Sequence, residues 1–253
     1  MAVPLSEAAA GAFTLEPGET KMFLTGVFNA GDHYFDSDGR LRKRETYRKY
    51  DLQLYAEHGL KDGLTAFGST GLQRIRAEDG GTFERQGLGR TELGLRQRVL
   101  QRDGWIVSLQ GSAVIAGAKE GPSVAVVGET DDQLDGRLLI ARSFELFGKP
   151  GFLDLAGGYR LRGGDPADEI RLDATLGLRV APRWLLMAQS FNTIATGTWA
   201  GRYPLKQRIY KAQASAIFDL SERWSLIGAA FVTPAGKDAL DERGATLGVG
   251  LRF

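Results

Sequence analysis

Twelve segments of this chain alternate apolar residues with polar or small ones, and this alternation limits the folds that are open to it. They lie near residues 21–35, 45–59, 64–76, 90–101, 105–117, 134–147, 151–162, 169–180, 184–195, 205–219, 224–233 and 243–253. Successive side chains of a strand point to opposite faces, so the alternation predicts half-buried β-strands. Sustained helical periodicity is hard to find, and the sequence predicts an all-β chain.

The connections between these segments alternate in length. Short turns such as KDG at 61–63 and RDG at 102–104 follow the even-numbered segments, whereas long connections such as AKEGPSVAVVGETDDQ follow the odd-numbered ones. Transmembrane β-barrels combine short periplasmic turns with long extracellular loops. We therefore predict a closed antiparallel transmembrane β-barrel of about twelve strands over residues 21–253, in the outer membrane of a Gram-negative cell. Residues 1–20 are predicted to form an N-terminal periplasmic segment.

Aromatic residues recur at the short turns. Trp105, Phe152, Trp184 and Trp224 stand at or just after such a turn, and Phe253 ends the last segment at the same end of the predicted barrel. Girdles of aromatic side chains flank the apolar band of transmembrane barrels. We interpret the five as a periplasmic girdle, and the alternative is a set of core aromatics in a soluble β-protein.

The strands differ in how cleanly they alternate. Segment 169–180 is the clearest, with apolar residues at even positions and polar or small residues at odd ones. Segments 184–195 and 224–233 do not alternate cleanly, and Arg142 falls on a position predicted to face lipid. A β-bulge and a different register are both open as explanations.

Composition excludes several classes of function. The 32 basic and 31 acidic residues leave a net charge of +1, which gives no reason to expect nucleic acid as a partner. Cysteine is absent, and no apolar run approaches the ~20 residues of a membrane helix. No motif for phosphate, zinc, calcium or a nucleophilic serine is found, so no cofactor or metal is expected. The start, MAVPLSEAAAGAF, lacks the basic region and apolar core of a signal peptide, which fits either a processed form or a protein that stays where it is made.

Basic residues predominate on the face predicted to line the lumen. The predicted lumen and solute-binding residues are Arg96, Arg98, Arg160, Arg162, Arg171, Asp173, Arg179, Lys211 and Arg252. Such a lining predicts a porin-like channel or transporter for a small polar, anionic or organic solute, with membrane lipid and the solute as partners. The same charges could instead pair with one another and plug a narrow barrel, which would then serve as a structural or partner-binding element.

Two further expectations concern particular residues. His33 lies beside Asp32 and near Asp36, which raises the alternative of an outer-membrane hydrolase, while His58 is predicted at the opposite end of the barrel. In the hairpin of residues 151–180, a turn centred on residues 166 and 167 would pair Arg160 with Asp173. It would also leave Arg162 and Arg171 unpaired near the extracellular mouth.

Two short stretches resemble a known family. Pro17, Gly18 and Glu19 form a Pro-Gly-Glu element, and a hairpin pattern follows with Tyr55, Glu57, Gly59, Leu60, Asp62, Leu64 and Thr65. Together with the barrel-like ending, these stretches resemble the outer-membrane transporters grouped with the meta-pathway of phenol degradation. The resemblance implies an outer-membrane barrel that takes up small organic compounds.

Overall fold

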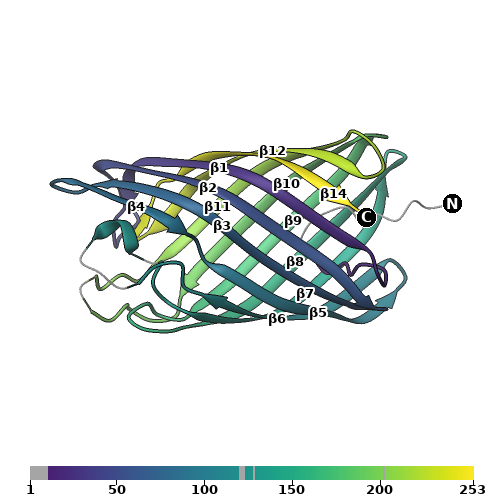
Figure 1. Cartoon of the computed structure of the whole chain (residues 1–253), viewed down its shortest axis with the longest axis horizontal. Coiled ribbons are helices and arrows are strands. Elements are labelled where there is room, and N and C mark those ends of the chain that lie inside the picture. The colour runs from purple at the N-terminus through teal and green to yellow at the C-terminus, as the bar shows by residue number, and fades with distance from the viewer. Residues whose placement is uncertain (1–10, 120–122, 128, 202) are drawn as a thin grey trace.

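The protein is a closed antiparallel β-barrel of twelve strands, seen here in a computed structural model that describes residues 11–119, 123–127, 129–201 and 203–253 (Figure 1). The barrel strands are β1 (Thr20–Phe35), β2 (Leu41–Lys61), β3 (Leu64–Glu78), β5 (Thr91–Arg102), β6 (Trp105–Ile115), β7 (Gln133–Leu146), β8 (Lys149–Arg162), β9 (Glu169–Ala181), β10 (Trp184–Ala195), β11 (Arg208–Asp219), β12 (Trp224–Lys237) and β14 (Arg243–Arg252). All twelve predicted strands are confirmed.

Pairing of the first strand with the last closes the cylinder. β1 pairs with β14 from Lys21 opposite Arg252 to Ala30 opposite Arg243, and it pairs with β2 on its other edge. Closure gives backbone N–H and C=O groups of both strands a partner, which lipid does not provide. No helix among the described residues is long and apolar enough to cross a membrane.

Two strands were not predicted. β4 (Thr82–Leu88) continues the ladder of β3 toward the loops, after a one-residue bulge near Gly89 that separates it from β5. β13 (Ala239–Leu240) pairs with the end of β1. A short 3₁₀ turn, η1 (Val124–Val126), lies in the connection between β6 and β7. These additions lengthen one wall beyond the rest of the barrel.

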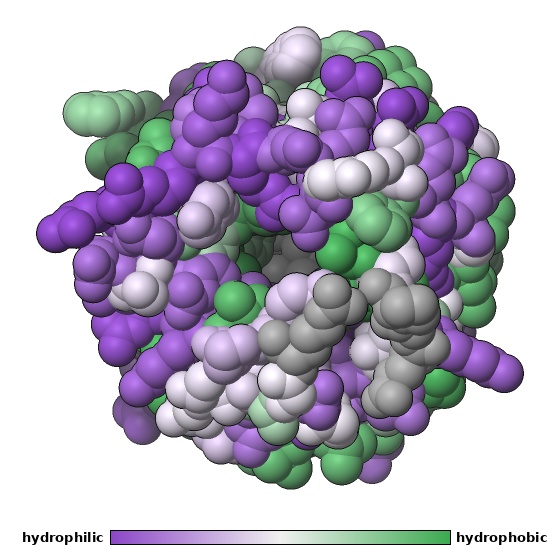
Figure 2. All heavy atoms as spheres, turned by 90° about the vertical axis from the view of Figure 1, so that its left-hand side faces the viewer, coloured by the Kyte–Doolittle hydropathy of each residue, from purple (hydrophilic) through white to green (hydrophobic). Residues whose placement is uncertain are grey.

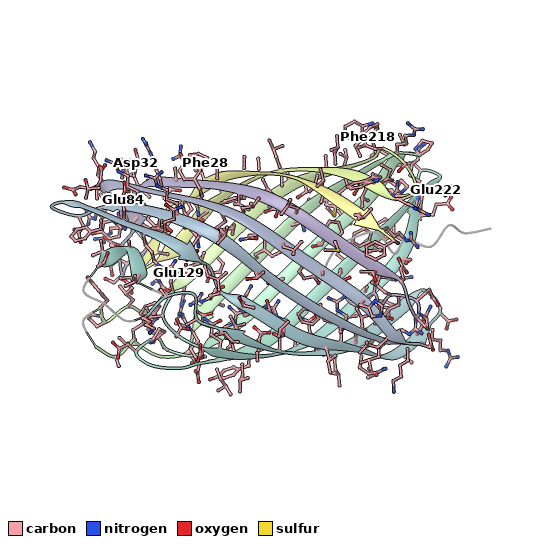
Figure 3. The ribbon with its side chains drawn as sticks, in the orientation of Figure 1. Phe28, Asp32, Glu84, Glu129, Phe218 and Glu222 are labelled. Atoms are coloured by element: carbon pink, nitrogen blue, oxygen red, sulfur yellow. The ribbon has the colours of Figure 1, made fainter. Side chains whose placement is uncertain are left out.

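The two ends of the barrel differ as the turn lengths predicted. Short turns lie at the end where the C-terminus is found, on the right of Figure 1, and the long connections gather at the other end with β4 and η1. We call these the turn end and the loop end. Figure 3 labels Phe218 and Glu222 at the turn end and Asp32, Glu84 and Glu129 at the loop end.

The outer surface is apolar, as a lipid-facing surface requires. Leu247 is 73% exposed and Leu93 is 62% exposed, and outward leucines continue around the wall. A folded chain leaves so continuous an apolar band exposed only where lipid covers it, and closed barrels of this type occupy outer membranes. The alternation thus places the protein in the outer membrane.

The predicted girdle is confirmed in part. Trp105, Trp184, Trp224 and Phe253 are 42 to 61% exposed at the turn end. The assignment of Phe152 to this girdle is wrong, because the side chain points inward and is 1% exposed. Phe152 shares its parity with the inward residues of β8, whose outward positions are the odd-numbered ones.

The irregular strands have a common cause. Leu185 and Met187 of β10 and Ile227 of β12 point inward, where they help to build an apolar layer inside the turn end. Apolar residues therefore occupy both faces of these strands there. The alternation of apolar and polar residues disappears, although the same positions still point inward. Arg142 does face outward, and its guanidinium stacks over Trp105 at 5.0 Å from the ring centre, at the level of the girdle.

The hairpin of β8 and β9 has a different register from the predicted one. Arg160 pairs with Glu169 and Asp173 pairs with Ala156, a shift of four positions that keeps the same faces inward. Residues 163–168 form a longer loop instead of a turn centred on Pro166. The carboxylate of Asp168 accepts a hydrogen bond from the backbone N of Arg162 (2.8 Å), and backbone groups of the loop bond to the next loop at residues 196 and 200.

Candidate functional site in the barrel lumen

The N-terminal segment, residues 11–19, lies against lumen side chains at the turn end. Ala12 N donates to Asp154 Oδ2 (2.6 Å), and Ala12 O accepts from Ser108 Oγ (2.6 Å). Leu15 N donates to Thr65 Oγ1 (2.9 Å). These bonds come from several barrel strands, so the segment is held across the lumen. The division into a periplasmic segment and a barrel remains a prediction.

Phe13 fills the apolar layer of the turn end. Its ring meets Phe152 edge to face, with ring centres 5.8 Å apart. Phe13 also packs against two buried groups, one with Leu139 and Ala141 and one with Leu185 and Ile217. An apolar ring that fills an apolar layer excludes water from the cross-section around it.

The Pro-Gly-Glu element turns the chain from the lumen into the barrel wall. Glu19 N donates to Glu16 O (3.0 Å) across a tight turn, and Gly18 has φ +84°, the left-handed conformation that glycine adopts at this turn position. Gly59 lies opposite, where a side chain would collide with the backbone of Glu16. Both motifs of the family resemblance thus serve the docking of the N-terminal segment.

Arg96 is a deeply buried charge of the lumen. Its guanidinium, 2% exposed, contacts the carboxylate of Glu57 at 3.0 Å and donates to Phe13 O at 2.9 Å. Tyr55 donates its hydroxyl to the same Glu57 carboxylate. Arg96 therefore joins the barrel wall to the N-terminal segment, and its charge is neutralised by Glu57.

A second ionic group lies midway along β7, β8 and β9. The carboxylate of Asp135 bridges Arg137 (2.6 Å) and Arg160 (2.9 Å), and Arg137 continues to Asp173 (2.8 Å). Arg171 lies 3.9 Å from Asp173. Asp173 thus pairs with Arg137 and not with Arg160, as the shifted register requires.

A third ionic group lies at the connection between β6 and β7. Asp131 accepts from Arg162 (2.8 Å) and Arg90 (2.7 Å), and Arg162 also contacts Glu169 (2.6 Å). The prediction that Arg162 is unpaired is therefore wrong. Burial alone would raise the pKa of Asp131, but the hydrogen bond from Arg162 and the charges of Arg90 and Arg162 outweigh it and lower that pKa.

The same connection reaches the opposite wall through Glu129. Its carboxylate contacts Lys49 of β2 (3.0 Å) and accepts from Gln73 of β3 (3.4 Å). Ala125 of η1 is buried beside the extended wall of β3 and β4. Figure 2 looks into this loop end, where mainly hydrophilic side chains surround a central hollow.

The remaining predicted lumen residues also have acidic partners. Pairs with nitrogen–oxygen distances of 2.5 to 2.9 Å join Arg98 to Asp62, Arg179 to Asp219, Lys211 to Glu242 and Arg252 to Glu19. Each predicted basic residue therefore lies beside a carboxylate. That these residues bind a solute stays a prediction.

Sequence reasoning identified Glu57 and Asp173 as inward acids but missed several other members of these ionic groups. Asp135 and Arg137 alternate with Leu134 and Leu138 in QLDGRLL, and extending the parity of β7 would have found them. Asp131 and Glu129 precede the strand, and no periodic signal marks them. Phe13 lies outside the repeating pattern altogether.

The histidines lie at opposite ends, as predicted. His58 Nδ1 is hydrogen-bonded to Thr20 Oγ1 (2.8 Å) at the turn end, and His33 Nδ1 to Asp32 Oδ1 (2.8 Å) at the loop end. Asp36 is engaged elsewhere, by Arg42 (2.9 Å) and its own turn. This arrangement gives the hydrolase alternative no support beyond the His33–Asp32 pair.

Comparison with solved structures finds the same fold. An outer membrane channel described as COG4313, from Pseudomonas putida F1, superposes with a TM-score of 0.79 at 16% identity, over 98% of this chain and all of that one. The NanC porin gives 0.58 at 10% identity over 91% and 98% of the two chains. The translocator domain of the autotransporter NalP from Neisseria meningitidis gives 0.54 at 12% identity, over 98% and 91%.

No family model matches the chain, and no curated protein matches it. The resemblance to transporters of the phenol-degradation type therefore stays a prediction. At these identities the solved structures establish the fold of an outer-membrane barrel, a fold that channels and autotransporter translocators share.

Proposed function

We propose that the protein is an outer-membrane channel that admits a small organic solute through its lumen, past the N-terminal segment. The observation that carries this proposal is the two-part lumen. Ion-paired polar walls line the loop half, and an apolar layer against which Phe13 packs lies at the turn end. A solute with polar and apolar parts meets matching surfaces in both halves, whereas a bare ion loses its hydration in the apolar layer.

The paired charges favour an uncharged or zwitterionic solute over a simple anion. Arg162 is balanced by Asp131 and Glu169, and Arg171 faces Asp173. A polar solute can exchange hydrogen bonds with such pairs without leaving a buried charge alone. The likeness of fold to an outer membrane channel from Pseudomonas putida F1 is consistent with this proposal.

Liposome swelling tests the proposal. Purified protein is reconstituted, and swelling is compared for a phenyl glycoside, a sugar of the same size and a potassium salt. We expect the phenyl glycoside to enter fastest and the salt slowest. Equal entry of all three would contradict the solute class, and no entry of any would contradict a channel.

One observation favours a second candidate function, a plugged barrel with a structural or partner-binding role. Residues 12, 13 and 15 make four hydrogen bonds to lumen side chains, which hold the segment in place. Absence of flux both in the native protein and in a variant with a weakened segment would favour this candidate over the channel.

A further inference from the structure

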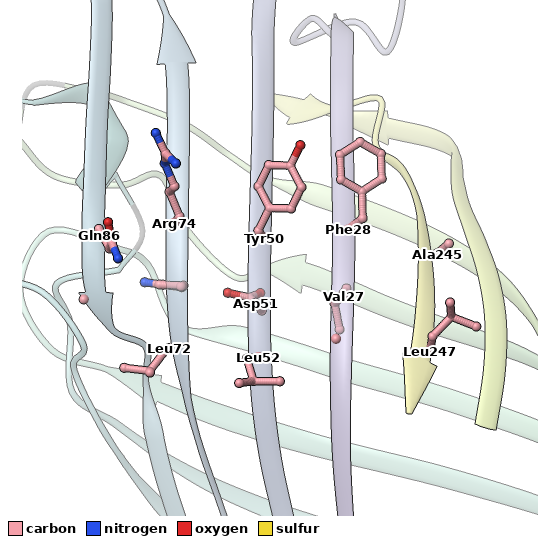
Figure 4. Close-up of a pocket in the computed structure, with 13 residues that line it drawn as sticks. Val27, Phe28, Tyr50, Asp51, Leu52, Leu72, Arg74, Gln86, Ala245 and Leu247 are labelled. Carbon is pink, nitrogen blue, oxygen red and sulfur yellow. The ribbon is translucent and has the colours of Figure 1, made fainter. Parts of the chain in front are cut away.

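The outer wall formed by β1, β2 and β3 changes from apolar to basic toward the loop end. Leu52 pairs across the ladder with Leu72, and the next outward pair in that direction is Tyr50 with Arg74. Figure 4 shows this order, with Tyr50 and Arg74 above Leu52 and Leu72. From one outward pair to the next, the side chains of the wall therefore change from those that suit lipid chains to those that suit lipid headgroups.

The following outward layer is the most basic part of the wall. It runs across five strands, β14, β1, β2, β3 and β4. Arg243 and Arg48 lie on either side of Ala30, and Arg76 pairs with both Arg48 and Glu84. Strands rise about 3.3 Å per residue, so Arg48 lies about 13 Å along β2 from Leu52. That span is short enough for a single lipid molecule to contact both.

A hollow of about 330 Å³ lies among the basic side chains. Its lining residues are Arg48, Tyr50, Arg74 and Arg76. Glu84 contacts Arg74 (3.3 Å) and Arg76 (3.7 Å), and Glu78 also contacts Arg76 (3.6 Å). Arg48 has no ion-pair partner among the described residues. The hollow thus keeps a net positive charge, with guanidinium groups exposed toward the membrane.

An apolar groove of about 580 Å³ adjoins this hollow and shares Tyr50 and Arg74 with it. Phe28, Leu52, Leu72 and Leu247 line the groove, which Figure 4 shows from outside the barrel. Its floor includes Gly26, where an added Cβ would come no nearer than 3.8 Å to another atom. The groove therefore has room for a flexible apolar chain.

The walls formed by β6 to β9 lack this change of character at the loop end. The outward residues there include Ile115 of β6, Leu134 of β7, Leu161 of β8 and Ile170 of β9, all exposed and apolar. A strand that is long enough to rise past the apolar band can present arginines beyond it, and β2, with 21 residues, is such a strand. The basic hollow and the groove thus coincide on the extended wall.

We propose that this wall is a binding site for a phosphorylated glycolipid of the outer leaflet, a lipopolysaccharide. A phosphate lies among Arg48, Arg74 and Arg76, where guanidinium groups donate paired hydrogen bonds to phosphate oxygens. One acyl chain lies in the groove beside Phe28 and Leu72. The proposal rests on the membrane placement of the barrel and is independent of what passes through the lumen.

Native mass spectrometry of the delipidated full chain in detergent tests the site, with rough lipopolysaccharide that lacks the O-chain as the probe. We expect one retained glycolipid per barrel. Arg48→Glu combined with Arg74→Glu should weaken binding by about tenfold for each guanidinium lost. Gly26→Phe fills the groove without changing charge and should also weaken binding. Arg208→Glu, on the outer face of β11, is the matched control and should bind normally.

Heat-modifiable migration on gels confirms that each variant is folded, and Arg48→Gln is the milder replacement if the double variant does not fold. Unchanged affinity in Arg48→Gln and Gly26→Phe would overturn the proposal. Equal retention of phosphatidylglycerol would overturn it by showing general attraction to anionic lipid. Displacement of the glycolipid by inorganic phosphate at millimolar concentration would overturn it by showing a simple anion site.

Discussion

Truncation of Phe13 should open the lumen without disturbing the barrel. The ring packs on Phe152 and on both buried apolar groups, but Phe13 itself belongs to a segment outside the sheet. Truncation of a fully buried phenylalanine to alanine costs about 3 to 5 kcal/mol of stability. Because Phe13 is only partly buried, we expect Phe13→Ala to weaken docking of the segment by about 2 kcal/mol.

That loss corresponds to a population of undocked segment about thirtyfold larger than in the native protein. The four hydrogen bonds of residues 12, 13 and 15 are retained, so the segment should dock and undock and not stay open. Single-channel recording in planar bilayers should show openings that are correspondingly more frequent, with the same open conductance. The matched control is Phe218→Ala, which removes an aromatic ring at the turn end from the outer face of β11.

Equal opening frequencies in the native protein and in Phe13→Ala would refute the reasoning, because the apolar layer would then not be the barrier. More frequent openings in Phe218→Ala would refute it as well, since the effect would come from a loosened barrel.

Three other outcomes follow from the structure. Leu176→Arg should cost about 2 to 4 kcal/mol of barrel stability because position 176 faces lipid, whereas Thr175→Arg should cost less because position 175 faces the lumen. Urea unfolding in lipid vesicles measures both losses, and equal losses would contradict the assigned faces. Arg96→Met should destabilise the barrel by about 3 to 5 kcal/mol, because the buried Glu57 carboxylate then lacks the guanidinium that neutralises it; combining it with Glu57→Gln should recover most of this loss in the same assay. The pKa of Asp131 is lowered in the folded protein, so the stability that its carboxylate adds to the fold is complete above its ordinary pKa of about 4 and is lost as the pH falls through the lower folded value. Hydrogen exchange at residues 129–132, corrected for intrinsic rates, should therefore accelerate only below about pH 4. The variant Asp131→Asn should show the faster exchange already at pH 7.

The strand pattern predicted the barrel well because local chemistry dictates it. Leu176 and Thr175 face opposite sides because of the pleat, and the lengths of the turns decide which ends of the strands meet. The connection of β8 and β9 was mispredicted because the hydrogen bonds of Asp168 and the neighbouring loop, and not Pro166, set its length. The register differs from the predicted one by four positions, an even number. Every side chain of this hairpin therefore stays on its predicted face, and only the residues paired across the two strands change.

The lumen was predicted less well, because its contacts join residues far apart in the sequence. Parity alone placed Arg96 and Arg162 inside, but it did not identify Glu57 or Asp131 as their partners. Arg162 meets Asp131 from a connection 31 positions earlier, and Arg96 meets the backbone of Phe13, 83 positions earlier. Such pairs depend on the curvature of the closed wall and on the path of segments outside the sheet.

The sequence by itself determined a closed barrel with an apolar outer face and two unlike ends, since period-two alternation and turn length act between neighbours in the chain. Only the tertiary structure decided that Phe13 packs against Phe152 and that each basic lumen residue meets a carboxylate. The physical reason is that closure brings opposite walls and the N-terminal segment within contact distance, and no local preference of the chain encodes which side chains then meet.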